Sequence, residues 1–454
     1  MENQTAVIAG SGVEGKLLAY VVSADIQKAK SLFTDNSDAV MEAITEYDTA
    51  SHKVMFRKNK QVTGKEPYIT EKLPRSWQKH INEVALYFLL NNPIKWTCKS
   101  DNDKEFELFN EFLESIRFNT TMRQAKRLAG AETHSAKLYH LYQEDNKPKV
   151  KCLVLSKSLG YDLYPMIDQW GTMIAFGVGY FLKEEAVSVE HFDIYTPSVI
   201  YRCKKDKGLW SVVPVSNPTG KINIIYYQQS KEWDGSQERI ERDEMQDSKS
   251  ADTNNYFADP IAIVTAGIIN SLPDVQSVGK LLQAQSREDS LTYVEPPSSN
   301  ELKESEKKTN MQAIQTDTFT PPFDFQSLSG LGVLSGEALK KILLPAYIKR
   351  NNNIEIYDIA VDREKSVILS VLGILYPKKK AAFDSIIIKH EFQEPFNEDK
   401  LATTTMLSNA VSAGIMSVDT AVPLLGLVDD NVAEIARIKA DLAQKVKEPI
   451  QLQK

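Results

Sequence analysis

The feature that most constrains the fold is a change of pattern near residue 136. Before it, apolar residues recur at helical spacing. After it, the chain carries short β-rich runs separated by turn signals. The runs are residues 137–142, 150–155, 173–182, 191–195, 198–203, 210–215 and 222–227. Short runs joined by turns predict a mostly antiparallel domain after a helical start, and hence an α+β fold.

Helical patterns flank this β-rich part on both sides. Before it we expect helices up to about residue 45, over 74–90, along the apolar stripe of 106–116, and over 122–138. After it, residues 354–375 read as a helix or as a helix followed by a strand, and 385–392 as a strand. Three further helices are expected at 397–413, 417–425 and 430–446.

Two segments between these blocks are polar on all sides. Residues 234–252 and 301–315 favour helix, yet the first has no apolar stripe and therefore no core of its own to face. The first segment carries seven acidic residues against three basic ones. A solvated helix is the simplest interpretation, and the wall of a channel or a subunit interface is the functional one.

Composition excludes several classes of protein. A chain of 454 residues with a net charge of -7 holds about three domain-sized units or one elongated subunit, and it is not a broadly basic nucleic-acid binder. Its three cysteines are far apart, which favours reduced, structural thiols in the cytoplasm. The longest apolar runs, 173–182 and 367–376, are shorter than the ~20 residues that cross a bilayer, so no membrane is expected as a partner, and no signal peptide is evident.

Two glycine-rich motifs invite a nucleotide-binding interpretation. Residues 10–16, from Gly10 to Lys16, match the first seven positions of a P-loop, but Leu17 replaces the Ser or Thr that binds Mg²⁺. Residues 330–336 resemble a dinucleotide fingerprint whose last glycine is one residue late, with no βαβ unit around it. A helix-capping terminus and a flexible loop are the simpler interpretations.

No catalytic or metal-binding constellation is visible in the sequence. The six histidines form no HExxH motif and no pairing with cysteine at metal spacing. His134 and His140 fall on different faces of the predicted helix. We therefore expect no catalytic residues, no metal and no cofactor, and a protein that is not an enzyme.

A loop with three glycines and three leucines precedes a helix with basic residues near both ends. Glycine lets such a loop move, whereas leucines do not belong on a solvated hinge. We therefore expect a part that slides against another molecule. The loop comprises Gln326, Ser327, Leu328, Ser329, Gly330, Leu331, Gly332, Val333, Leu334, Ser335 and Gly336.

The order of these parts resembles the portal proteins of tailed double-stranded DNA bacteriophages, in the long-tailed branch. The phrases that carry the resemblance are residues 47–54, 75–96, 125–141, 165–168 and 175–181, the Ser335–Leu339 phrase behind the loop, and residues 414–437. Each phrase is of low specificity, but together they span roughly residues 46–445. The segment before the first polar helix, 221–225, departs from the family's proline-containing phrase.

The resemblance implies a portal-like subunit with a mixed α/β wing, a helical stem, a small α/β clip, a tunnel loop and a helical crown. On this chain, residues 1–45 are an N-terminal segment, 46–233 the wing, 234–257 and 300–322 the stem helices, and 258–299 the clip. Residues 323–336 are the tunnel loop, 337–396 a helix returning to the wing, and 397–454 the crown.

The same resemblance implies a function and its partners. Copies of the chain, usually twelve, form a closed ring at one capsid vertex of the virion, after assembly in the host cytoplasm. Double-stranded DNA is packaged and ejected through the axial channel. The ring also binds the major capsid protein, the scaffold, the terminase large subunit and then a head–tail adaptor.

Three sets of residues follow as candidate sites. The loop 326–336 faces the DNA, and Lys340 and Lys341 contact its phosphates. An acidic wall avoids the counterion release by which a basic channel would bind and stall DNA. The wall residues are Glu238, Glu241, Asp243, Glu244, Asp247 and Asp252.

Two other classes of function remain open from the sequence. One is a nucleotide-binding enzyme built on the Gly10 to Lys16 loop. The other is a non-viral adaptor with helices and strands, in which the 325–336 loop would lie at a partner interface.

Overall fold

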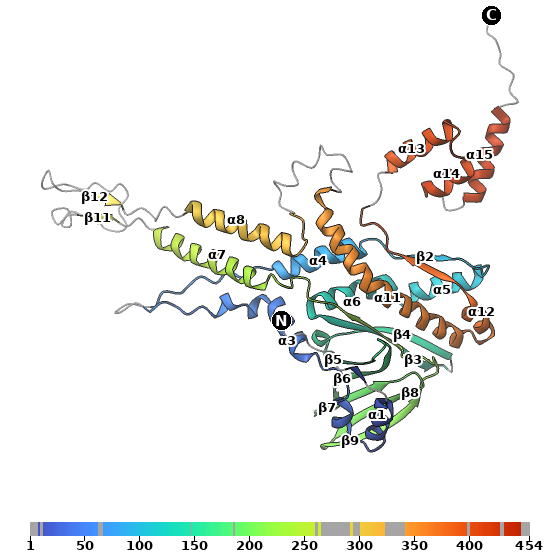
Figure 1. The fold of residues 1–454 in the computed structure, drawn as a ribbon, viewed down its shortest axis with the longest axis horizontal. Helices are drawn as coiled ribbons and strands as arrows, with labels where there is room; N and C mark the ends of the chain where they lie inside the picture. The colour runs from blue at the N-terminus through green and yellow to red at the C-terminus, as the bar shows by residue number, and fades with distance from the viewer. Residues whose placement is uncertain are drawn as a thin grey trace, which may run out of the picture. The chain divides into compact units, whose positions relative to one another are not determined.

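We describe a computed structural model of the chain. It describes residues 8–9, 12–61, 67–145, 147–184, 187–258, 262–264, 291–293, 300–322, 341–396, 400–426 and 431–445. The chain divides into two compact units, Met1–Gln393 and Glu394–Lys454. Helices and strands are mixed throughout the first unit, as the predicted α+β class requires (Figure 1).

Two antiparallel sheets form the centre of the first unit. The larger has the order β1-β5-β6-β7-β8-β9, and only β1 runs parallel to its neighbour. Its strands are β1 (Ile8–Ala9), β5 (Tyr161–Asp168), β6 (Met173–Glu184), β7 (Val187–Tyr195), β8 (Val199–Asp206) and β9 (Leu209–Ser216). The smaller sheet, β10-β3-β4, consists of β3 (His134–Glu144), β4 (Lys147–Leu155) and β10 (Ile224–Gln228).

All seven β-rich runs of the sequence are strands, and β5 is a strand that the sequence analysis did not predict. Pro165 interrupts that segment, and proline argues against a central strand. The structure explains its presence, because β1 pairs only with Ile167 and Asp168. At Pro165 the strand is therefore an edge, where proline is tolerated.

Apolar layers stack on both faces of these sheets. Helices α1 (Val13–Val22) and α2 (Ile26–Lys30) bury Leu17, Val21 and Ile26 on the six-stranded sheet. Phe176, Ile224 and Leu138 belong to a second cluster between the two sheets. Each such side chain contributes about 1.5–3 kcal/mol when fully buried.

A helical layer covers the other face of the smaller sheet. It consists of α4 (Trp77–Leu90), α5 (Asp103–Ser115), α6 (Phe118–Glu132), α11 (Leu344–Leu375) and α12 (Lys380–Ser385). A small ladder of β2 (Lys95–Cys98) and β13 (Ile388–Glu391) packs with them. Helix α11 has 32 residues and is about 48 Å long.

Two boundaries differ from the sequence predictions. The helix predicted over 122–138 ends at Glu132, because Thr133 takes a left-handed φ of 67° and residues from His134 onward pair in β3. His134 and His140 therefore lie on a strand, and the prediction of different helical faces was wrong. For residues 354–375 the sequence left two alternatives, a helix or a helix followed by a strand. The structure shows a helix throughout this range, and it begins at Leu344.

The polar segments form an extended pair of helices beside this body. Helix α7 (Gln237–Ala258) contacts α8 (Asn300–Asp317), and the short strands β11 (Ala262–Val264) and β12 (Leu291–Tyr293) pair with each other between them in sequence. A small cluster anchors the base of the pair, where Ile240 and Ile314 meet Trp233 and Ile81. The sequence analysis missed this anchor, because one isoleucine per helix makes no stripe.

The second unit contains α13 (Lys400–Ser412), α14 (Val418–Leu425) and α15 (Asn431–Lys445), as predicted. Gly414 and Gly426 end the first two of these helices with φ values of 70° and 62°. Left-handed residues are common helix terminators, and glycine adopts them without a Cβ clash.

Candidate functional site

The helix pair α7–α8 and its surroundings hold most of the predicted site residues that the structure describes. The predicted loop, residues 326–336, and Lys340 lie outside the described residues. Lys341 is described, and it is exposed at the start of the segment that leads into α11. The loop is thus bracketed by the end of α8 at Asp317 and the start of α11 at Leu344.

An extended segment, residues 68–76, runs along α7 and is held through its backbone. The side chains of Asp252, Ser248 and Glu244 accept the backbone N–H groups of Glu71, Leu73 and Arg75 at 2.8, 3.0 and 2.8 Å. The acceptors are four residues apart and therefore share one helix face. The donors are two residues apart, the repeat of an extended chain. We call residues 53–61 and 67–76 the arm; η2 (Lys53–Phe56) is its first turn.

Ion pairs reinforce this contact between the arm and α7. Arg57 reaches Asp252 at 2.7 Å, and Arg75 reaches Asp243 at 3.1 Å and Asp247 at 2.7 Å. The indole of Trp77 also donates to Asp243, at 3.3 Å. These bonds account for an acidic helix without an apolar stripe, because the chain's own arm takes up the carboxylates.

His52, just before the arm, forms the most buried of these pairs. Its Nδ1 lies 2.6 Å from Glu244, and its Nε2 donates to the Glu46 carbonyl at 2.8 Å. Burial disfavours the charged imidazole, but the hydrogen bond and charge of Glu244 outweigh it, and the pKa of His52 is raised. With both ring nitrogens engaged in this way, the protonated form fits the site.

Five of the six predicted wall residues are bonded within the chain. Asp243, Glu244 and Asp252 are buried and bonded within the chain, so they present no free charge to a channel. Glu241 and Asp247 are partly exposed and paired with Lys53 and with Arg75 and Lys307. Of the six, Glu238 is the exposed residue for which the described part of the chain offers no ion pair.

Helix α8 packs on the side of α7 away from the arm (Figure 1). Asn310 donates to the Arg239 carbonyl at 2.8 Å, and Gln246 donates to the Lys303 carbonyl at 3.1 Å. Arg242 pairs with Glu306 at 2.6 Å and Lys307 with Asp247 at 2.7 Å. The arm, α7 and α8 therefore form three adjacent layers.

A half-buried lysine joins this assembly to α11. The Lys349 ammonium donates to the carbonyls of Glu232 and Thr318 at 2.9 and 3.0 Å, and it lies 2.9 Å from the Glu232 carboxylate. Glu232 precedes α7 and Thr318 follows α8. One side chain of α11 therefore holds the base of the helix pair, where α7 begins and α8 ends.

Glu232 also receives the fully buried Lys126 of α6. Burial alone would raise the pKa of Glu232, but Lys126 and Lys349 lower it to about 2. The pKa of Lys126 is lowered by its burial. Sequence reasoning missed this three-residue junction, because its members lie on three distant segments and no local pattern marks them.

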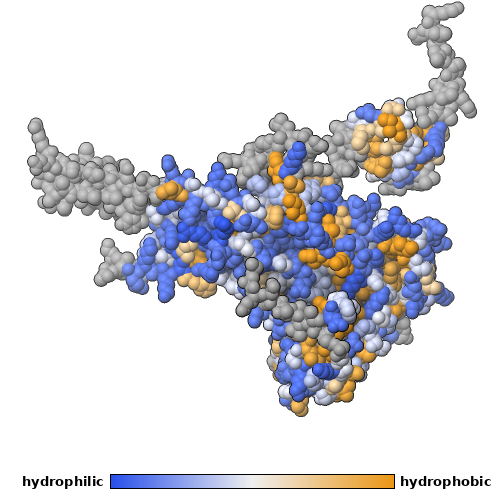
Figure 2. Space-filling view, viewed as in Figure 1, coloured by the Kyte–Doolittle hydropathy of each residue, from blue (hydrophilic) through white to orange (hydrophobic). Residues whose placement is uncertain are grey.

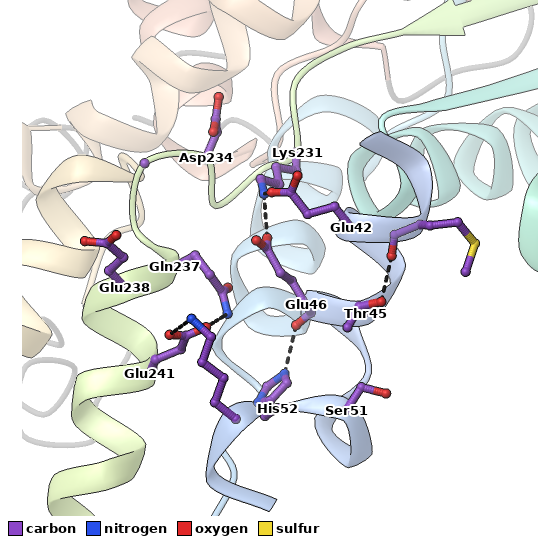
Figure 3. A pocket seen from close by; sticks show the side chains of 13 residues that line it. Glu42, Thr45, Glu46, Ser51, His52, Lys231, Asp234, Gln237, Glu238 and Glu241 are labelled. Carbon is purple, nitrogen blue, oxygen red and sulfur yellow. Dashed lines mark hydrogen bonds and ion pairs between the residues drawn. The ribbon is translucent and has the colours of Figure 1, made fainter. Parts of the chain in front are cut away.

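A cleft of about 690 Å³ opens between α3 (Ser37–Tyr47), the arm and the start of α7 (Figure 3). Lys231 bridges Glu42 and Glu46 at 2.8 and 2.6 Å on one wall, and Lys53 pairs with Glu241 at 2.8 Å on another. The arrangement is ionic and contains no nucleophile paired with a base. Within the described ranges no group of three His, Cys, Asp or Glu residues is placed to hold a metal.

The nucleotide-loop candidate occupies a strand–loop–helix, β1 followed by α1. Gly12 takes a φ of 92° before the helix, while Gly10 and Ser11 lie outside the described residues. Leu17, at the position of the missing hydroxyl, is buried in the core against the sheet. Its role here is packing. Within the described segments, no helix is long and apolar enough to cross a membrane.

Comparison with known proteins gives one family and several solved structures. The family model described as "Phage portal protein, SPP1 Gp6-like" matches residues 26–448. No curated protein matches.

Three of the similar structures come from gene transfer agent particles. A chain from the neck of the native particle, computed with C12 symmetry, shares 11% sequence identity with this chain. The match covers 87% of this chain and 94% of that one, at a TM-score of 0.45. The virion of the native particle is 10% identical over 86% and 93%, with a TM-score of 0.42. The neck of the empty particle, computed with C6 symmetry, is 11% identical over 87% and 94%, also with a TM-score of 0.42.

Proposed function

This chain belongs to the SPP1 Gp6-like family of phage portal proteins, and we propose that its copies close into a ring that conducts double-stranded DNA into and out of a capsid. The observation that carries the proposal is the extent of the family match, residues 26–448. It includes the wing-like sheets, the α7–α8 pair and the C-terminal helices. The ring would sit at one vertex of a virion.

The parts of the ring follow from the order of the elements. In this proposal α7 and α8 are the stem, and β11 and β12 belong to the clip. Residues 323–336 are the tunnel loop and 397–454 the crown. Terminase would dock on the clip during packaging and a head–tail adaptor afterwards, while the capsid protein and scaffold would contact the wing.

The Lys349 junction supports a mechanical role for α11. The loop 326–336 precedes α11, and α11 is bonded through Lys349 to the base of the stem pair. A displacement of the stem would therefore reach the helix behind the loop. Lys340 and Lys341 would contact passing phosphates weakly, since contacts between exposed charges are screened by salt.

Electron microscopy of the purified protein, with its mass measured in solution, tests the proposal. Twelve copies of the 51.1 kDa chain give a ring of about 610 kDa with an axial hole. A chain that stays without a ring, even with scaffold and capsid protein present, contradicts the proposal. Nucleotide turnover abolished by Lys16→Ala would favour the enzyme, whereas the conduit predicts unchanged assembly in that variant.

A further inference from the structure

The arm, α7 and α8 form three layers. The exposed charges on the two outer layers, the arm and α8, have opposite signs. Ser248 and Glu244 hold the arm on one side of α7. On the other side, Gln246 and the carbonyl of Arg239 hold α8. Figure 1 shows α8 and the arm flanking α7 in this order. Each outer layer therefore has a face turned away from α7.

The outward face of the arm is basic and apolar. Lys58, Lys60 and Lys72 are exposed, and among the described residues none forms a salt bridge, although the charge of Lys60 acts on Asp252 of α7. Phe56, Ile69 and Leu73 are 72%, 74% and 42% exposed beside them. Because α7 grips the arm through backbone N–H groups, these side chains do not take part in holding it.

The outward part of α8 is acidic. Glu301 and Glu304 are exposed and have no ion pair within the described part of the chain. Leu302 is 77% exposed on a different flank of the helix, where it lines a groove with Arg239 and Arg242 of α7. Lys308 is also exposed, but it lies one turn further toward the base of the pair.

The part of the arm around Lys72 lies at nearly the same height along α7 as the start of α8, and Lys58 and Lys60 lie about a turn further along, beside Asp252. The Lys303 carbonyl is bonded to Gln246, and the Leu73 amide is bonded to Ser248. Two helical residues correspond to about 3 Å along the axis. The contacts of a closed ring are related by rotation alone. With the three layers side by side around the ring axis, faces at one height on opposite sides of α7 meet in neighbouring copies.

We propose that the arm of each copy packs on α8 of the next copy, with its three lysines against Glu301 and Glu304. The inference rests on the ring of the proposed function and names the surfaces that close it. The interface is heterologous: each copy offers its arm on one side and α8 on the other. Opposite charges at such an interface fix partner and register.

Charge reversal tests this interface by the mass of the assembled protein. Lys58→Glu/Lys60→Glu/Lys72→Glu places a negative arm against an acidic α8, and Glu301→Lys/Glu304→Lys places a positive α8 against a basic arm. Each variant alone is expected to shift assembly to at least tenfold higher protein concentration. Combining all five changes in one chain restores rings. An equal mixture of the two variants does so as well, through alternating copies.

Lys147→Glu/Lys378→Glu/Lys389→Glu is the matched control, because it changes net charge equally at exposed lysines away from both faces. It is expected to assemble like the wild type, and circular dichroism checks that every variant is folded. Rings from each reversed variant alone, or no recovery in the mixture, overturn the interface and leave the conduit intact. A wild-type chain that never forms a ring overturns the proposed function, and the interface with it.

Discussion

At the scale of single residues, the chain uses buried charge to join segments that are distant in sequence. His52 and Glu244 are 192 positions apart, and Lys349 binds Glu232 from 117 positions away. The sequence predicts the helices that carry them, since helical periodicity is local. It does not predict the pairs, because a charged residue that will be buried looks the same as one on a solvated face.

His52 gives a prediction with a definite sign. Its raised pKa means that the folded protein holds the proton more tightly than the unfolded chain. The resulting stability is fully present below the unfolded pKa of about 6.5 and is lost as pH rises through the higher folded value. Urea unfolding of wild type and His52→Gln should therefore differ most below pH 6.5 and converge at alkaline pH.

His140 supplies the opposite case within the same protein. Burial lowers its pKa, so the folded state disfavours its protonation. His140→Gln should remove a penalty that grows as pH falls below about 6.5. If both histidine variants shift stability with the same pH dependence, the assignment of the Glu244 pair as the cause is contradicted.

Lys349 tests the junction between the α7–α8 pair and α11. Lys349→Met should lower the free energy of unfolding by about 3 kcal/mol, because it leaves the Glu232 carbonyl, the Thr318 carbonyl and part of the Glu232 charge without a partner. Chemical denaturation measures the loss. Lys341→Met, at an exposed position, should stay within about 0.5 kcal/mol of wild type. Equal losses of unfolding free energy in the two variants would contradict a stabilising role for the Lys349 junction.

At the scale of elements, α7 shows that one polar composition is compatible with two structures, a solvated helix and a helix that holds another segment. Its polar character was evident in the sequence, and the helix itself was confirmed. Its use was not evident, because acceptors placed every four residues to hold an arm have the same pattern as a solvated helix. Figure 2 shows this region as mostly hydrophilic surface, which is compatible with either arrangement.

Amide exchange distinguishes the bonded arm from a merely adjacent one. Ser248→Ala removes the acceptor of the Leu73 amide. A hydrogen bond of about 1 kcal/mol corresponds to roughly fivefold to tenfold faster exchange at Leu73. Lys249→Ala, at the exposed neighbouring position, should leave that rate unchanged. Unaltered exchange in both variants would mean that the Ser248 hydrogen bond does not help to hold the arm at Leu73.

At the scale of the whole molecule, the net charge of -7 bears on passage of DNA. The sequence predicted the order of helical and β-rich parts, because the periodicity of apolar residues is local and needs no tertiary information. The stacking of two sheets under one helical layer was not, because it depends on which faces meet. The charge, by contrast, is fixed by composition, and an acidic ring should bind DNA weakly.

The assembled protein should therefore bind duplex DNA with a dissociation constant weaker than about 10⁻⁵ M at physiological salt, near the weak end of non-specific binding. Lys341→Ala should lower the salt dependence of that binding, because each phosphate contact contributes about one unit of slope. Fluorescence anisotropy across a salt series measures it, with Lys147→Ala as an exposed control on the wing. An equal change in both variants would place Lys341 away from the DNA path. A tight complex would require basic surfaces that the acidic composition of this chain does not lead us to expect.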